Sequence, residues 1–177
     1  MQSFEQSKRY IELALDKSVE KFLSRLFLRN APLRTINIVA PYISAMSGTR
    51  FSLLDLRKKV EREGVPMYVI TRAPSEPYQQ EAMKILQNSP WIEIRYNASV
   101  HAKVYVANAQ HESESFALFG SSNLTAKAIE SNIEVAMLIY NEGPGREILR
   151  ELNYWAGVRL RTLKESRLVQ PIKVPRR

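Results

Sequence analysis

The spacing of hydrophobic residues changes along the chain, and it predicts which segments are helices and which are strands. In residues 4–29 apolar side chains recur about every 3.6 positions, which is typical of a helix with one buried face. Short apolar runs bounded by Pro, Gly or polar residues indicate strands instead. We expect strands over residues 35–40, 67–71, 91–96, 100–107, 116–119 and 133–140. We expect further helices over residues 51–63, 78–87, 125–129 and 145–164, the first of them ending at a C-cap, Gly64.

The order of these elements predicts the fold class. Strands alternate with helices in the first half of the chain, which favours an α/β fold with a mixed, mostly parallel β-sheet sandwiched between helices. The 177 residues fit one domain, and the sequence shows no internal repeat or linker. We therefore expect a single domain over 1–177. Its core covers about 33–141, its flanking helices cover 4–29 and 145–164, and 165–177 form a loose basic tail.

Composition narrows the class of protein. Hydrophobic residues make up 45% and charged residues 25%, the usual mix of a globular domain. No apolar run approaches the ~18 residues that a membrane-spanning helix needs, and the N-terminus does not resemble a signal peptide. The chain has no cysteine, which excludes disulfides and thiolate metal sites. We expect a soluble, cytoplasmic protein that makes no contact with a membrane.

The net charge of +8 favours a polyanionic partner. Neutralising phosphates with Lys and Arg releases condensed counterions, so a basic protein gains affinity for nucleic acid. Lipid surfaces are polyanionic as well, and a basic protein can also have no such partner. Charge alone therefore leaves these alternatives open.

Three short motifs carry groups suited to phosphate chemistry. His101 and Lys103 stand two positions apart at the start of an apolar strand, where alternate residues share a face. The sequence GSSN, residues 120–123, ends a strand and opens a helix, which is typical of a phosphate cradle. Glu134 lies in another apolar strand and needs a partner if it is buried. Each motif alone is ordinary: a surface histidine, a helix N-cap, an edge-strand glutamate. Together they should arise by chance in fewer than about one in a thousand chains of this size.

The combination resembles the HxK…GSxN…E signature of the phospholipase D superfamily. The segments INIVAPYIS and EREGVPMYVIT are also similar to that family, and the resemblance covers roughly residues 33–141. It implies a phospholipase D-like fold. The chain departs from the fuller pattern HxKxxxxD, because Asn108 stands where the family commonly has Asp. Some nucleases of the family lack this Asp too, so the change favours a nuclease over a lipase, and its effect on catalysis stays open. His111 lies in a polar loop and is expected to take no part.

The resemblance also implies a mechanism and a set of site residues. His101 is the nucleophile that forms a covalent phosphohistidine, and Glu134 accepts a hydrogen bond from the distal nitrogen of its ring. Lys103, Ser121 and Asn123 hold the phosphate oxygens. No metal or other cofactor takes part. The family site needs two HxK motifs and this chain has one, so the resemblance implies a homodimer in which a second His101 protonates the leaving group.

Three functions remain to be weighed. The first is a nuclease, acting on DNA more readily than on RNA, with an approach groove lined by basic residues. We expect these to include Arg50, Lys58, Lys59, Arg72, Lys127, Arg159 and Arg161. The second is a phospholipase or phosphatidyl transferase, which should carry two motifs in one chain or an apolar anchor. The third is a nucleic-acid-binding or nuclease subunit of a restriction or defence complex, in which a partner protein supplies target recognition.

Overall fold

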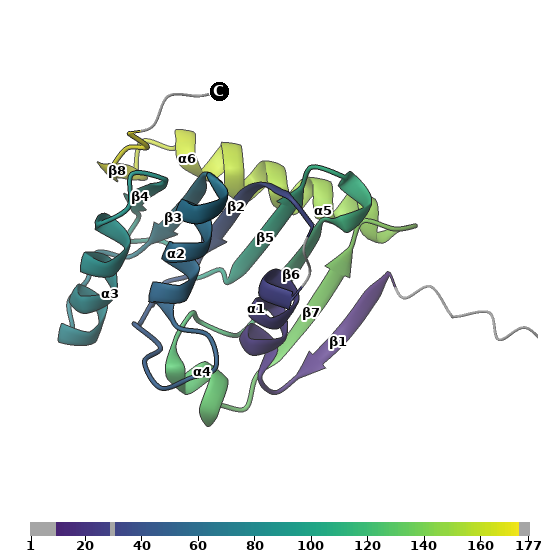
Figure 1. Ribbon diagram of the computed structural model, residues 1–177, viewed down its shortest axis with the longest axis horizontal. Helices are drawn as coiled ribbons and strands as arrows, with labels where there is room; N and C mark the ends of the chain where they lie inside the picture. The colour runs from purple at the N-terminus through teal and green to yellow at the C-terminus, as the bar shows by residue number, and fades with distance from the viewer. Residues whose placement is uncertain (1–9, 29–30, 174–177) are drawn as a thin grey trace, which may run out of the picture.

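A computed structural model describes residues 10–28 and 31–173 of the chain, and within them one mixed sheet carries helices on both faces (Figure 1). The strands are β1 (Ile11–Leu15), β2 (Leu33–Val39), β3 (Met67–Thr71), β4 (Ile92–Tyr96), β5 (Val104–Ala109), β6 (Phe116–Gly120), β7 (Val135–Tyr140) and β8 (Arg167–Gln170). The helices are α1 (Ser18–Leu28), α2 (Leu53–Glu63), α3 (Pro77–Gln87), α4 (Ala126–Glu130), α5 (Gly145–Tyr154) and α6 (Leu160–Thr162). A 3-10 turn, η1 (Glu112–Glu114), follows β5, and a π-helical segment, η2 (Trp155–Arg159), joins α5 to α6.

The strand order is β1-β7-β6-β5-β2-β3-β4-β8, which confirms the α/β class and the mixed sheet. The expectation of a mostly parallel sheet is wrong. Only the β2–β3 and β3–β4 pairs are parallel, and the other neighbouring pairs of these described strands are antiparallel. The reason lies in the connections. Helices α2 and α3 provide the crossovers that parallel neighbours need, whereas β5 and β6 are joined by a loop that permits only an antiparallel return.

The predicted first helix over residues 4–29 is wrong in its first part. Residues 4–9 lie outside the described residues, and 11–15 form the edge strand β1, which pairs antiparallel with β7. Asp16 and Lys17 both have positive φ angles, 58° and 48°, and this turn separates the strand from α1. Pairing with β7 has overridden a helix-like spacing of apolar residues, as tertiary contacts often override local propensity.

The expected loose tail over residues 165–177 is also wrong in part. Residues 167–170 form β8, which pairs antiparallel with β4, and 174–177 lie outside the described residues. The side-chain amide of Gln170 donates to the carbonyls of Ser89 and Ile92, both at 2.9 Å. These bonds hold the segment against an edge strand that would otherwise leave backbone groups unpaired.

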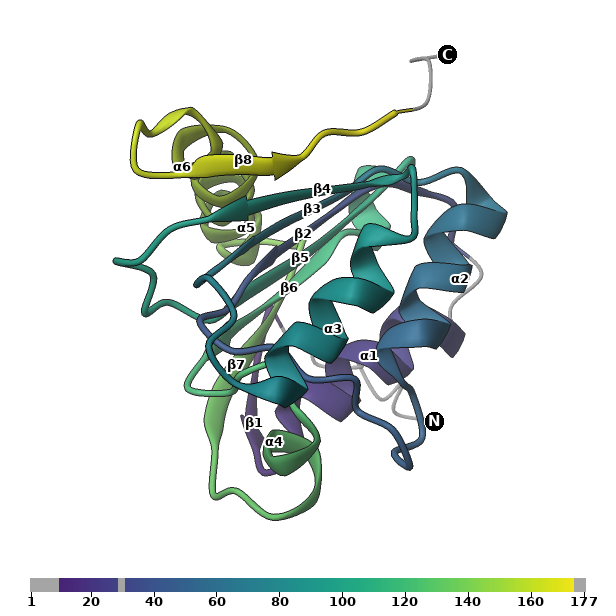
Figure 2. The same ribbon diagram turned by 90° about the vertical axis from the view of Figure 1, so that its left-hand side faces the viewer.

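Two hydrophobic cores hold the helices to the sheet. In Figure 2 the sheet is nearly edge-on, with α1, α2 and α3 on one side and α5 and α6 on the other. The first core packs Phe22 of α1 against the rings of Tyr105 and Phe116, at centroid distances of 5.6 and 5.2 Å. The second core joins residues of β2, β5 and β7 to Leu149, Ala156 and Leu160 of the α5–α6 segment. Both layers predicted from the sequence are therefore present.

The caps of α2 agree with the sequence. Ser52 and Asp55 form a capping box at its start, and Gly64 ends it at a φ of 63°. A Cβ at this glycine would lie 3.3 Å from the Trp91 ring, so the position favours glycine for space as well as for conformation. The chain then turns directly into β3, which fixes where the carboxyl end of that strand lies.

A buried carboxylate ties α6 to the sheet. Glu93 of β4 accepts hydrogen bonds from Arg161 at 2.8 Å and from Arg95 at 2.7 Å. Burial by itself raises the pKa of the Glu93 carboxyl, but the bonds and charges of the two arginines outweigh it and leave that pKa lowered. A carboxyl with a lowered folded-state pKa stabilises the protein above its unfolded pKa, and this contribution is lost as the pH falls through the folded value.

We expect Glu93→Gln to lower the free energy of unfolding by about 3 kcal/mol at pH 7, because it leaves two arginines without their buried partner. The deficit should shrink as the pH falls from the usual glutamate pKa of about 4.3 towards the lowered pKa of Glu93, where the wild-type carboxyl also loses its charge. Urea denaturation at several pH values measures both the loss of stability at pH 7 and its decrease at lower pH. Glu147→Gln, which removes an exposed carboxylate 3.7 Å from Arg150, is the control and should change stability by less than about 0.5 kcal/mol. Equal losses in the two variants would contradict the account.

Candidate active site

Strand pairing brings the three sequence motifs to one end of the sheet. Strands β5 and β6 are antiparallel with Val104 opposite Phe119, so the start of β5 meets the end of β6. The Gly120 N–H donates to the Lys103 carbonyl at 3.2 Å. Strand β7 is antiparallel to β6 in turn, with Gly120 opposite Ala136, and its start therefore lies at the same end. The HxK segment, the GSSN segment and the residue before β7 converge there, beside α4 at the bottom of Figure 1.

His101 lies in an extended segment before β5, not inside the strand, which begins at Val104 rather than at residue 100. Its ring is exposed, and its Nε2 lies 2.5 Å from a guanidinium nitrogen of Arg72. A guanidinium only donates hydrogen bonds, so Nε2 is the acceptor in this contact and the proton of a neutral ring is on Nδ1. The lone pair at Nε2 therefore points to Arg72 in this structure.

Arg72 is held in place by further contacts. It directly follows β3, and its Nε donates to the Val100 carbonyl at 2.9 Å. A terminal nitrogen donates to the Tyr42 hydroxyl at 3.3 Å, and the guanidinium carbon lies 5.7 Å from the centre of the Tyr42 ring. Arg72 is therefore a fixed cation directly beside the candidate nucleophile.

The GSSN segment combines polar groups with different surroundings. Ser121 is exposed, and its hydroxyl donates to Glu134 while accepting from the Val135 N–H at 3.1 Å. Ser122 is buried, with its hydroxyl 2.5 Å from that of Ser18 and its carbonyl accepting from the Tyr105 hydroxyl at 2.7 Å. Burial, and secondly the nearby charge of Glu134, raises the pKa of Tyr105 well above its usual value, so Tyr105 remains a donor. Ser122 thus anchors the segment, whereas Ser121 faces the site.

Asn123 and Lys103 keep unused hydrogen-bonding capacity. The Asn123 side-chain oxygen is buried and has no hydrogen-bond partner among the described residues. Lys103 is half-buried and forms no ion pair within residues 10–28 and 31–173. The Lys103 ammonium and the Asn123 amide nitrogen are donors suited to hold the oxygens of a phosphate, whereas the Asn123 oxygen can only accept.

Glu134 is buried, and it lies just before β7 with different partners from those predicted. Its two oxygens accept from Ser121 and from the Asn132 amide, the latter at 3.0 Å. No hydrogen bond joins it to His101 in the part of the chain that the structure describes. Glu134 therefore orients the Ser121 hydroxyl in this structure, and the predicted bond to the distal nitrogen of His101 is not formed.

The position that departs from the HxKxxxxD pattern lies at the other end of β5. The Asn108 amide nitrogen donates to the Thr35 hydroxyl and to the Asn153 side-chain oxygen, both at 2.7 Å. Seven residues of extended chain separate it from His101, so it does not touch the candidate site. His111, which follows β5 at that same end, is likewise exposed and remote. Replacement of Asp by Asn at 108 thus leaves the groups around His101 intact.

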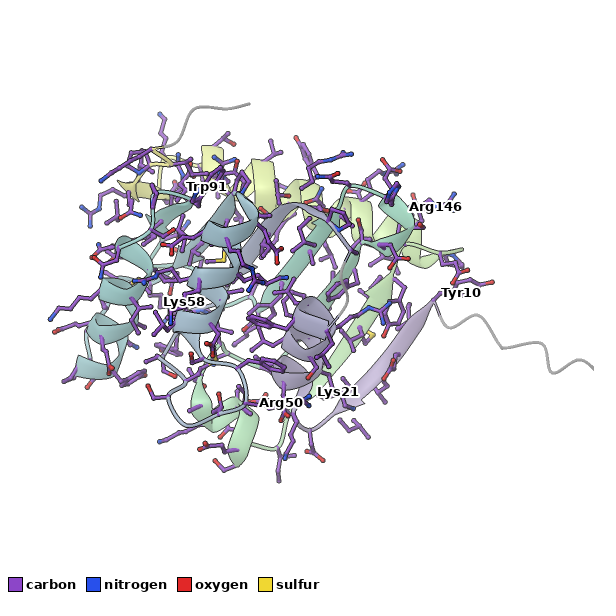
Figure 3. The ribbon with its side chains drawn as sticks, viewed as in Figure 1. Tyr10, Lys21, Arg50, Lys58, Trp91 and Arg146 are labelled. Atoms are coloured by element: carbon purple, nitrogen blue, oxygen red, sulfur yellow. The ribbon has the colours of Figure 1, made fainter. Side chains whose placement is uncertain are left out.

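The predicted approach groove of seven basic residues does not exist as one surface. Lys59 is buried and paired with Glu63 at 2.7 Å on the side of α2. Arg161 is on the opposite side of the sheet, paired with Glu93 and 3.8 Å from the centre of the Tyr68 ring. Figure 3 shows Lys58 on α2, the helix that also carries Lys59. The spread follows from helices on two faces, which the sequence spacing of these residues could not show.

Arg72 is the residue whose role was missed. The sequence suggested only a groove residue, because nothing local marks an arginine as the neighbour of a histidine 29 positions away. The position of Arg72 directly after β3 could have indicated a role at the site, because the carboxyl ends of neighbouring parallel strands meet at one edge of a sheet. Tyr42, which follows β2, was missed for the same reason.

A sequence model described as cardiolipin synthase, PLD-like domain, matches residues 27–156. Among solved structures, the chain is similar to a phospholipase D family member, Nuc, from Salmonella typhimurium (TM-score 0.59, 19% identity, 91% of this chain and 99% of that one). It is similar to NucT from Helicobacter pylori (0.60, 15%, 90% and 99%) and to a phosphatidylserine synthase from Haemophilus influenzae (0.57, 14%, 90% and 39%). No curated protein matches the sequence. At these identities the structures support the fold, and the match of the sequence model supports the family.

Two searches of the described residues bear on other classes of site. No helix among them is long and apolar enough to cross a bilayer. No group of three or more His, Cys, Asp or Glu side chains in residues 10–28 and 31–173 is arranged to hold a metal ion.

The contact between Arg72 and His101 makes a spectroscopic prediction. At a pH where the ring is neutral, the wild-type Nε2 should give the 15N shift of an unprotonated, hydrogen-bonded nitrogen, and Nδ1 that of a protonated one. Arg72→Ala removes the donor and should move the Nε2 shift, whereas Arg50→Ala should leave it unchanged. Long-range 1H–15N correlation spectra measure this. A neutral wild-type ring protonated at Nε2 would contradict the geometry.

Proposed function

The chain belongs to the phospholipase D-like domain family, whose members act on phosphodiesters, and from this we propose that it is a metal-independent nuclease cleaving DNA through a covalent phosphohistidine. The observation that carries the proposal is the convergence of His101, Lys103, Ser121 and Asn123 at one end of the sheet, around a ring nitrogen whose lone pair accepts a hydrogen bond from Arg72. The net charge of +8 supports a nucleic acid as the substrate.

The first step forms a bond between Nε2 of His101 and the phosphorus and breaks the bond from phosphorus to the leaving oxygen. A phosphodiester repels nucleophiles, so its charge must be neutralised as they approach. Lys103 and the Asn123 amide donate to the non-bridging oxygens, with the Ser121 hydroxyl beside them. When the phosphate enters, the terminal nitrogen of Arg72 donates to a phosphate oxygen instead of Nε2, which frees the lone pair, while the Arg72 Nε keeps its bond to the Val100 carbonyl.

A second imidazole completes the reaction. The leaving oxygen takes a proton from His101 of a second subunit, which is then neutral and can accept a proton from water in the next step. That water attacks the phosphorus, breaks its bond to Nε2 and releases the product. The chain has one HxK motif, so we propose a two-fold symmetric homodimer in which the second His101 faces the first. A further protein that selects the target fits the absence of a separate recognition segment in the described residues.

The second candidate is a phospholipase or phosphatidyl transferase. The fold shared with a phosphatidylserine synthase and the cardiolipin synthase description of the family favour it. The same histidine chemistry would serve, with an alcohol in place of water in a transferase. The two candidates differ in substrate and not in the catalytic groups, so parallel assays separate them.

We expect the wild-type protein to cleave plasmid or single-stranded DNA in the presence of EDTA, because its histidines supply both nucleophile and acid. His101→Ala should lower the rate at least about a thousand-fold, as loss of a nucleophile does. His111→Ala removes the other histidine of the chain and is the matched control, with unchanged cleavage expected. Turnover of phosphatidylcholine or phosphatidylglycerol vesicles without DNA cleavage would overturn the nuclease proposal in favour of the second candidate.

Mixed dimers test the shared site. Co-expression of differently tagged wild-type and His101→Ala chains allows isolation of the heterodimer by two affinity steps. Its activity should fall far below half that of the wild type, because the one site on the axis lacks either its nucleophile or its acid. Half activity in the heterodimer would show that each subunit works alone and would contradict the proposal.

A further inference from the structure

A pocket lined mainly by polar residues lies on the α5 side of the sheet, at the end remote from the candidate active site around His101. Its volume is about 570 Å³, and it opens between β2, β5, α5 and η2. The side chains of Asn37, Asn108 and Asn153 line it, and the site around His101 contributes no residue to it. Ligand pockets commonly measure roughly 300–1,000 Å³, so this one is large enough for a drug-sized molecule.

The asparagines leave hydrogen-bonding capacity unused. The Asn153 side-chain oxygen accepts from the amide nitrogens of Asn37 and Asn108, at 2.9 and 2.7 Å. The Asn37 side chain is only 2% exposed, and its oxygen has no hydrogen-bond partner among the described residues. The Asn153 nitrogen donates no hydrogen bond within residues 10–28 and 31–173. A buried amide oxygen without a partner is costly, so a ligand that pairs with the Asn37 oxygen gains affinity.

The rim of the pocket is cationic. Arg34, Arg146 and Arg150 line it, and Glu112 is the single carboxylate among its described lining residues. Arg150 lies 3.7 Å from both Glu147 and Glu151, in exposed pairs that a better anion can replace. Figure 3 shows Arg146 at the edge of the molecule, well separated from Arg50 near the lower end. The arginines suit a phosphate, which guanidinium groups bind through paired donors.

Two features of the backbone and sequence belong to this pocket. Asn108, which stands where the HxKxxxxD pattern has Asp, lines the pocket, so the side chain at this position is a neutral amide and adds no negative charge. The π-helical segment η2 passes over Asn37, and a Cβ on Gly157 would lie 3.0 Å from the Asn37 nitrogen. π-helical turns are rare in proteins, and those that do occur are often found at functional sites.

We propose that this pocket binds a mononucleotide, separately from the catalytic site. The rim arginines hold its phosphate, and the asparagine amides pair with donors and acceptors on the edge of its base. Amides recognise base edges because each offers a donor and an acceptor side by side. Neither half of the pocket suffices alone: the arginines supply affinity for the anion, and the amides require a partner with both kinds of hydrogen-bonding group.

Isothermal titration of the full-length protein with AMP, GMP, CMP and UMP, and with inorganic phosphate, tests the proposal. We expect at least one of the four nucleotides to bind saturably, with one molecule bound per chain. Inorganic phosphate should bind at least ten-fold more weakly than that nucleotide. Asn108→Asp should lower the affinity for the nucleotide at least ten-fold, because it places a carboxylate in the pocket. Arg146→Gln should lower this affinity roughly ten-fold. Arg50→Gln is the matched control and should leave the affinity unchanged.

Lys103→Ala distinguishes this pocket from the catalytic site, because it should leave nucleotide binding unchanged. Binding that Lys103→Ala abolishes and Asn108→Asp does not would overturn the proposal, as would the absence of binding by all four nucleotides. Equal affinity for phosphate and nucleotides would overturn the role of the amides. Circular dichroism checks that the Asn108→Asp variant is folded. If that variant does not fold, Arg146→Gln still tests the proposal, because Arg146 is exposed and its replacement should not disturb the fold.

Discussion

The antiparallel hydrogen-bonded ladder of β5, β6 and β7 is the constraint on which the candidate site depends. It sets the start of β5 beside the end of β6 and the start of β7, so that His101, Asn123 and Glu134, which are 11 to 33 positions apart in the sequence, share one end of the sheet. A shift of one residue in the pairing would turn each following side chain to the other face. The buried hydroxyl of Tyr105 reinforces this register, because it bonds the Ser122 carbonyl within the segment that carries Asn123.

The parallel half of the sheet supplies the rest of the site. The crossover through α2 brings the carboxyl ends of β2 and β3 to the same edge, where Arg72 contacts both Tyr42 and His101. The site is thus built where parallel and antiparallel pairing meet, between β2 and β5. One copy of it holds a single histidine of an HxK motif beside candidate phosphate-binding groups, which is why the proposed reaction needs two chains.

The sequence was sufficient for the α/β class, most element positions and the family, because short motifs with rare joint spacing and buried apolar runs are local signals. It failed where long-range pairing decides. Residues 11–15 have a helix-like spacing but form an edge strand on β7, and 167–170 read as a tail but pair with β4. The hydrogen-bond partners of Glu134 and the contact between Arg72 and His101 could not be predicted for the same reason, because both depend on side chains that the sheet brings together. Asn108 shows the converse: a departure visible in the sequence acquires meaning only once its distance from His101 is known.

The central claim is that His101 attacks phosphorus directly, and trapping the adduct tests it most directly. A DNA substrate mixed with the protein in EDTA is quenched in alkali, which preserves phosphohistidine, and the digested protein is analysed by mass spectrometry. The account predicts a nucleotide-bearing peptide that contains His101 and not His111. DNA cleavage with no adduct under these conditions, or an adduct on any other residue, would contradict it.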